Sequence, residues 1–132
     1  MKQQANLLIV DDEPEIRELL QEFLQLKGYA VVTAANGVEA LACLKAQKPD
    51  LALIDMWMPG MHGLDILRSI RAIDPSIGVI MMTGLCDAEV ARQAIEHGAL
   101  DYLTKPLEFR RLEDAIRAGL TGAPHACPAR LA

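Results

Sequence analysis

Five polar residues of this sequence follow short apolar runs, and their side chains are of the types that handle metal ions and phosphate. They are Asp11 and Asp12 after residues 7–10, Asp55 after 51–54, Thr83 after 78–82, and Lys105 after 100–103. Carboxylates bind hard cations such as Mg²⁺, an ammonium group supplies a fixed positive charge, and a hydroxyl supplies a hydrogen-bond donor. Brought together, these groups would suit the binding of a phosphoryl group and its metal.

Each of these residues also has an ordinary explanation when it is taken alone. The pair Asp11–Asp12 is typical of a helix cap, Asp55 of a turn before Met58–Pro59–Gly60, and Lys105–Pro106 of the lead into a helix. Three clustered carboxylates would repel one another unless a cation or protons joined them. Their shared position, at the ends of different apolar runs, therefore favours one common site.

The elements that must position these residues alternate along the chain. Five short apolar runs are typical of strands buried in a parallel sheet, at residues 7–10, 30–33, 51–54, 78–82 and 100–103. Apolar residues recur at helical spacing over residues 16–26, 38–44, 64–73, 90–95 and 112–120. This alternation predicts an α/β fold, with a parallel sheet and helices on both faces. The carboxyl ends of its strands would meet at one edge, where ligands bind.

Capping residues predict several helix boundaries. Asp12 is predicted as the N-cap of the first helix and Gly28 as its C-cap, and the second helix is expected to open near Asn36–Gly37. Asp87 is predicted as the N-cap of the fourth helix and Gly98 as its end.

Length and composition limit the classes of protein to which the chain could belong. Its 132 residues, of which 52% are hydrophobic, fit one globular domain, expected at residues 1–122, with a tail or the start of a linker at 123–132. The net charge of -5 argues against direct nucleic-acid binding. No apolar run has the length of a signal-peptide core or a membrane span, which predicts a cytoplasmic protein without membrane contact. The three cysteines and three histidines lack the spacing of metal ligands.

Four segments of the sequence together resemble the receiver domain of two-component response regulators. They are Ile9–Pro14, Asp55–Gly63, Met82–Gly84 and Gly98–Pro106, and they agree with that family in order and spacing. The resemblance covers roughly residues 5–122. It implies a flavodoxin-like (βα)5 fold, which is a doubly wound five-stranded parallel sheet with strand order 2-1-3-4-5 and helices on both faces.

The resemblance also implies a role for each residue of the predicted site. Asp55 would accept a phosphoryl group from a sensor histidine kinase or a phosphotransfer protein, and Thr83 and Lys105 would bind phosphoryl oxygens. The implied ligands of Mg²⁺ are Asp11, Asp12, Asp55 and the backbone carbonyl of Trp57. The bond between Lys105 and Pro106 would be cis. Such a domain catalyses only its own phosphorylation and dephosphorylation, and it is not otherwise an enzyme.

In that family, phosphorylation changes a surface. Carried over to this sequence, Thr83 would move toward the phosphate, and the ring of Tyr102 would turn inward to fill the space. The surface of the fourth helix, fifth strand and fifth helix would then control an output domain or a partner, and it could also form a homodimer. Ala115 stands where winged-helix regulators carry a basic residue of their dimer face. The alternative for Tyr102 is a half-buried strand aromatic with an exposed hydroxyl.

Two positions that vary in the family flank the path of an attacking water. Here they are Trp57, which is large, and Leu85, which is apolar. We hypothesise that these two side chains shield the acyl phosphate and slow its hydrolysis. The alternative is that Trp57 only covers the rim of the site.

Three other functions are weighed against this one. A haloacid dehalogenase-like phosphatase would need a second aspartate two residues after Asp55, where this sequence has Trp57. A flavin-binding electron carrier would need Gly, Ser and Thr where the sequence has acids at 11–13. A receiver-like interaction module used without phosphorylation would have no need of the complete site.

Overall fold

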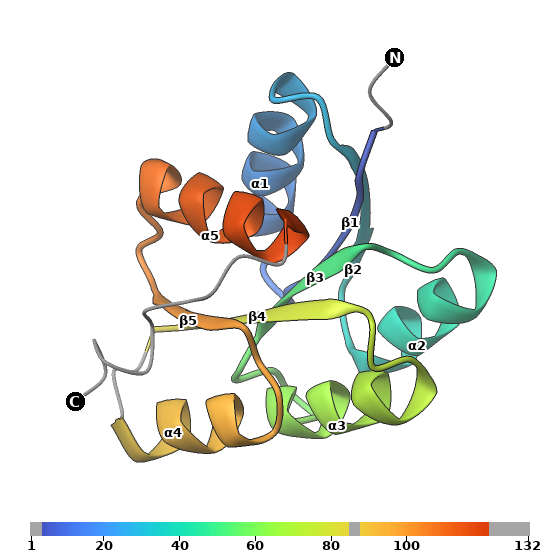
Figure 1. The fold of residues 1–132 in the computed structure, drawn as a ribbon, viewed down its shortest axis with the longest axis vertical. Helices are drawn as coiled ribbons and strands as arrows, with labels where there is room; N and C mark the ends of the chain where they lie inside the picture. Colours follow the sequence, from blue (N-terminus) through green and yellow to red (C-terminus); the bar gives the residue numbers. More distant parts are fainter. Residues whose placement is uncertain (1–3, 85–87, 122–132) are drawn as a thin grey trace.

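The computed structural model describes residues 4–84 and 88–121, in which five strands and five helices alternate (Figure 1). The strands are β1 (Asn6–Val10), β2 (Ala30–Ala34), β3 (Leu51–Asp55), β4 (Gly78–Thr83) and β5 (Asp101–Thr104). The helices are α1 (Pro14–Leu26), α2 (Gly37–Ala46), α3 (Gly63–Ile73), α4 (Ala88–Glu96) and α5 (Phe109–Thr121). All strand pairs are parallel and the order is β2-β1-β3-β4-β5, which confirms the predicted doubly wound α/β fold.

The sheet separates two apolar cores. Figure 1 shows α1 and α5 on one face of the sheet and α2, α3 and α4 on the other. Leu7 and Ile9 of β1 pack in the core under α1 and α5, whereas Leu8 and Val10 pack in the opposite core. All five residues of the central strand β3 are buried. Strands buried on both faces read as continuous apolar runs, which is why β1 and β3 stand out in the sequence. Within the described residues, no helix has the length and apolar character needed to cross a bilayer.

The start of α1 differs from the prediction. The N-cap is Glu13 rather than Asp12, and Pro14 is the first helical residue. The Oδ1 atom of Asp11 accepts a hydrogen bond of 2.9 Å from the backbone N–H of Glu13, so the side chain that fixes this loop comes from Asp11. Asp12 is left exposed at the edge of the sheet.

The other predicted caps have mixed outcomes. The expected opening of α2 near Asn36–Gly37 is confirmed, and Asn36 is the N-cap, whose Oδ1 accepts a hydrogen bond of 2.9 Å from the N–H of Glu39. The C-cap of α1 is Lys27 and not Gly28, which lies one residue beyond it with a φ of 97°. The N–H groups of Gly28 and Tyr29 donate back to carbonyls of the last turn, as in a Schellman motif. The predicted cap Asp87 lies outside the described residues.

A close backbone contact fixes the end of β3, where Asp55 lies. The N–H of Gly63, the first residue of α3, donates to the carbonyl of Met56 at 2.8 Å. A Cβ atom added to Gly63 would lie 2.7 Å from both the carbonyl oxygen of Asp55 and the Cα atom of Met56. Glycine at position 63 therefore lets α3 start directly against the strand end that carries Asp55.

An ion pair between a partly exposed arginine and a buried aspartate fastens α5 to β5. The guanidinium group of Arg111 donates from both terminal nitrogens to the carboxylate of Asp101, at 2.9 and 2.8 Å. The Asp101 side chain is 1% exposed, and its Oδ1 also accepts a hydrogen bond from the N–H of Tyr102. A buried carboxylate needs such partners, and the two-pronged guanidinium suits it well. The pair was not anticipated from the sequence.

Candidate functional site

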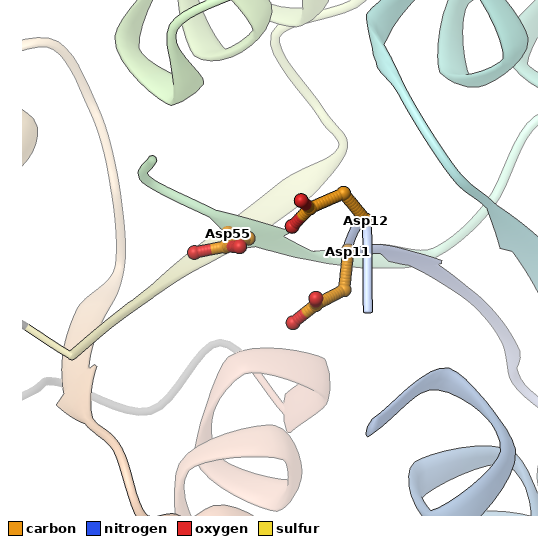
Figure 2. Close-up of side chains that lie close together, drawn as sticks. All are labelled: Asp11, Asp12 and Asp55. Atoms are coloured by element: carbon orange, nitrogen blue, oxygen red, sulfur yellow. The ribbon is translucent and has the colours of Figure 1, made fainter. Parts of the chain in front are cut away.

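Three of the predicted site residues meet beyond the ends of β1 and β3. Asp11 and Asp12 follow β1, and Asp55 ends the neighbouring strand β3. One carboxylate oxygen from each lies within 4.8 Å of those of the other two. Figure 2 shows the three side chains close together at this edge. Asp11 and Asp55 are buried and Asp12 is exposed, so the cluster has one side open to solvent.

Lys105 supplies the positive charge of the site. Its Nζ atom lies 2.7 Å from Oδ2 of Asp11, 3.3 Å from Oε1 of Glu13 and 3.5 Å from Oδ2 of Asp55. The contact with Glu13 adds a fourth carboxylate that sequence reasoning did not assign to the site. Its position next to Asp12 was the available signal. The Lys105–Pro106 peptide bond is cis, as the resemblance implied.

Burial and charge shift the protonation of two of these groups. Burial raises the pKa of Asp55 from an ordinary 3.8 to about 6, the negative charge of Asp11 adds to the rise, and Lys105 opposes it. Burial alone would lower the pKa of Lys105, but its interactions with Asp11, Asp55 and Glu13 together outweigh burial and raise that pKa. At neutral pH the site therefore holds an ionised carboxylate at position 55 facing a fixed ammonium group.

Thr83 ends β4, the strand next to β3, and Tyr102 lies on β5, the strand beyond it. Thr83 is fully buried at the end of β4, and its carbonyl accepts a hydrogen bond of 2.7 Å from the N–H of Lys105. Tyr102 is 6% exposed and packs in the core under α2, α3 and α4. The alternative of a half-buried ring is therefore wrong for Tyr102. The other predicted residue of this region, Leu85, lies outside the described residues.

An open pocket of about 490 Å³ is lined by Asp12, Glu13, Asp55, Trp57, Gly84 and Lys105. Trp57 is 41% exposed, and its N–H lies 3.4 Å from Oδ1 of Asp55. The Trp57 indole meets the imidazole of His62 edge to face, with ring centroids 4.4 Å apart and planes at 76°. A second hollow of about 550 Å³, bordered by Arg71 and Ser76, contains none of the predicted site residues.

The donor set suits a small hard cation. Three carboxylates within 4.8 Å of one another offer oxygen ligands only, which is the chemistry that Mg²⁺ prefers. The ammonium group of Lys105 contacts Asp11, Asp55 and Glu13, and Asp12 adds a further carboxylate, so the cluster retains negative charge for a cation to neutralise. The predicted role of the Trp57 carbonyl as a ligand stays a prediction.

Comparisons with known proteins agree on one family. Residues 7–117 match the family described as the response regulator receiver domain. The chain is 40% identical over 111 residues to sporulation initiation phosphotransferase F of Bacillus subtilis, covering 84% of this chain and 90% of that protein. It is 38% identical over 117 residues to the probable C4-dicarboxylate response regulator DctR of Priestia megaterium, covering 87% of this chain but only 51% of that protein.

Solved structures give the same result. A receiver domain protein described as CheY-like from Methanospirillum hungatei superposes with a TM-score of 0.87 at 32% identity, covering 91% of this chain and 96% of that one. A receiver domain protein from Clostridium thermocellum superposes with a TM-score of 0.84 at 35% identity, covering 89% and 95%. With its family match, its relatives and its fold in agreement, this chain belongs to the receiver domains of two-component response regulators.

Proposed function

We propose that the chain accepts a phosphoryl group on Asp55 in a reaction that requires Mg²⁺. The observation that carries the proposal is the cluster of Asp11, Asp12, Asp55 and Lys105, of which all but the buried Asp11 line one pocket that is open to solvent. A phosphoryl group in transfer needs charge neutralisation and positioning more than covalent help from the protein. An ammonium group and a cluster of metal-binding carboxylates around one ionisable acceptor meet that need.

The residues of the chain would divide these tasks. An oxygen of Asp55 is the nucleophile, and it is ionised above a pH of about 6 because that is where its pKa lies. Lys105 would pair with a phosphoryl oxygen, and the hydroxyl of Thr83 would donate to another. Asp11, Asp12, Asp55 and the carbonyl of Trp57 would hold Mg²⁺. When bound, the metal would neutralise charge on the phosphoryl oxygens.

The donor and the recipient of the signal are also part of the proposal. The phosphoryl group would come from a sensor histidine kinase or a phosphotransfer protein. The surface of α4, β5 and α5 would then change and control an output domain or a partner, with a homodimer through the same surface as one form. Residues 1–122 would be the receiver domain and 123–132 a tail or linker. The domain would act only on its own phosphorylation and dephosphorylation, without contacting nucleic acid or membrane.

Beryllofluoride, an analogue of the bound phosphoryl group, provides the test. Trp57 is the only tryptophan of the chain and lines the pocket beside Asp55, so its fluorescence should report occupancy. We expect beryllofluoride with Mg²⁺ to change the fluorescence of the wild-type chain but not that of Asp55→Asn. Acetyl phosphate should label the wild type alone. No response in the wild type would favour an interaction module that works without phosphorylation.

A further inference from the structure

The lysine of the site follows a short strand at the margin of the sheet. β5 has four residues, and in the described sheet it pairs with β4 alone. Lys105 comes directly after β5, and its N–H donates to the carbonyl of Thr83 at 2.7 Å. An edge strand is held by backbone hydrogen bonds on one side only. The position of Lys105 therefore depends on what secures β5 elsewhere.

The ammonium group of Lys105 needs such support. Its Nζ atom lies 2.7 Å from Asp11 and 3.5 Å from Asp55, and the side chain is only 15% exposed. A lysine side chain is a flexible four-carbon stem with many rotamers. Its ammonium group keeps one place in a crowded site only if the backbone that carries it is fixed.

Helix α5 provides a firm base next to β5. Phe109, the first residue of α5, stacks on Phe23 of α1 with ring centroids 4.3 Å apart. Leu112 and Ile116 of the same helix are fully buried in the core that α5 shares with α1. Close-packed cores yield little to local strain, so the first turn of α5 is held in place.

The pair Asp101–Arg111 joins this base to the strand. Asp101 begins β5, and its two carboxylate oxygens accept hydrogen bonds of 2.9 and 2.8 Å from Arg111, in the first turn of α5. The oxygen Oδ1 also accepts from the N–H of Tyr102 at 2.7 Å. Two parallel hydrogen bonds fix direction as well as distance. The segment that carries Lys105 is thus tied together on both sides, four residues before the lysine and six residues after it.

We propose that Arg111 is a positioning residue, which holds β5 through Asp101 and thereby keeps the ammonium group of Lys105 in the site. This inference rests on the proposed phosphorylation of Asp55. Arg111 is not among the described residues that line the pocket, so it would act through Lys105. Lys105 would pair with a phosphoryl oxygen, whereas carboxylates would bind the metal. Loss of the ion pair should therefore weaken binding of a phosphoryl group and leave binding of Mg²⁺ unchanged.

Competitive acetylation of lysines tests the position of Lys105 without any phosphoryl group. Trace acetic anhydride is added to the wild type, Arg111→Ala and Asp101→Asn, and mass spectrometry gives the acetylation of Lys105 relative to the exposed Lys45. This ratio should rise about fivefold in both variants, as for loss of one hydrogen bond's worth of protection. The matched control is Arg117→Ala, which should not change the ratio, because Arg117 pairs with Glu113 within α5.

Trp57 fluorescence gives the second measurement. The dissociation constant of beryllofluoride at saturating Mg²⁺ should rise about tenfold in Arg111→Ala and in Asp101→Asn, the lower end of what loss of a supporting partner costs a site. The dissociation constant of Mg²⁺ alone should not change. A general loosening of the site would weaken binding of both. Arg111→Lys, which keeps the charge, should recover part of the affinity for beryllofluoride.

Urea unfolding identifies the variants that are folded, and Asp101→Asn, which keeps the shape of its side chain, serves if Arg111→Ala does not fold. Unchanged acetylation of Lys105, unchanged affinity for beryllofluoride, or equal losses of affinity for beryllofluoride and Mg²⁺ would overturn the positioning role. Absence of any response to beryllofluoride in the wild type, or the same response in Asp55→Asn, would instead overturn the proposed phosphorylation. The acetylation of Lys105 would still decide whether Arg111 positions it.

Discussion

Replacing Asp55 by Asn is expected to make the folded domain more stable at neutral pH. Asp55 is buried beside Asp11, and together burial and that charge raise its pKa from 3.8 to about 6, against the opposing charge of Lys105. The folded state therefore binds a proton at position 55 more tightly than the unfolded state does. As the pH rises from about 4 to above 6, ionisation of Asp55 therefore lowers the free energy of unfolding of the wild type. Asparagine carries no charge and is spared that loss.

The size of the effect follows from the two pKa values of Asp55. At about 1.4 kcal/mol for each tenfold change in proton affinity, the rise from 3.8 to about 6 corresponds to about 3 kcal/mol at pH 7.5. The same linkage gives about 1.5 kcal/mol at pH 5 and about 0.5 kcal/mol at pH 4. Asp55→Asn should thus exceed the wild type in free energy of unfolding by amounts that shrink in acid.

Urea unfolding with EDTA, followed by circular dichroism at pH 7.5, 5 and 4, measures this difference. The matched control is Asp114→Asn, because Asp114 is an exposed acid on α5 and its replacement should change stability by less than about 0.5 kcal/mol. Equal stability of Asp55→Asn and wild type at pH 7.5 would refute the reasoning. A gain that stayed constant down to pH 4 would also refute it, since the effect would then not arise from titration.

Three further changes test the contacts that hold the site. Gly63→Ala should lower the free energy of unfolding by about 2–3 kcal/mol, because its Cβ would meet backbone atoms at 2.7 Å. The control Gly84→Ala, whose Cβ would have nothing within 4 Å, should leave the free energy of unfolding nearly unchanged in the same urea titration. Arg111→Ala should cost about 3 kcal/mol or more by leaving Asp101 buried without its guanidinium, as thermal or urea unfolding would measure. Asp12→Asn should weaken Mg²⁺ binding about tenfold or more, measured by titration of tryptophan fluorescence.

Each of these three predictions has an outcome that would contradict it. Equal losses of unfolding free energy in Gly63→Ala and Gly84→Ala would mean that the close backbone contact at position 63 is not the cause of the loss. If Arg111→Lys were as stable as the wild type, a single positive charge without the two-pronged geometry would be enough to hold Asp101. The exposed acid Asp65 provides the control variant Asp65→Asn. If Asp12→Asn bound Mg²⁺ as tightly as this control, Asp12 would not be a ligand of the metal.

The strands were the part of the fold most directly predictable from the sequence. The central strands are buried on both faces, so their apolar runs end abruptly where the chain reaches the edge of the sheet. That abrupt change from Val10 to Asp11 and from Ile54 to Asp55 is also what identified the carboxylates. The same rule places Thr83 at the end of β4.

Other features depend on packing that the sequence does not express. Asp11 and Asp12 are adjacent and chemically identical, yet only Asp11 turns inward to hold Lys105 and the start of α1. The ion pair between Asp101 and Arg111 is another such case. An acid inside a buried run had to have a partner, but Arg111 lies ten residues on, across a turn whose geometry sets the distance.

The hydrogen bond between Lys105 and Asp11 joins residues that are 94 positions apart in the chain. β5, which ends one residue before this lysine, is the last strand of the described residues and forms one margin of the sheet. A nascent or truncated chain that stops short of it holds all three aspartates without their ammonium partner. Under the proposed function, such a molecule would be a poor acceptor, so phosphorylation would depend on a domain in which the end of β5 has already packed beside β4.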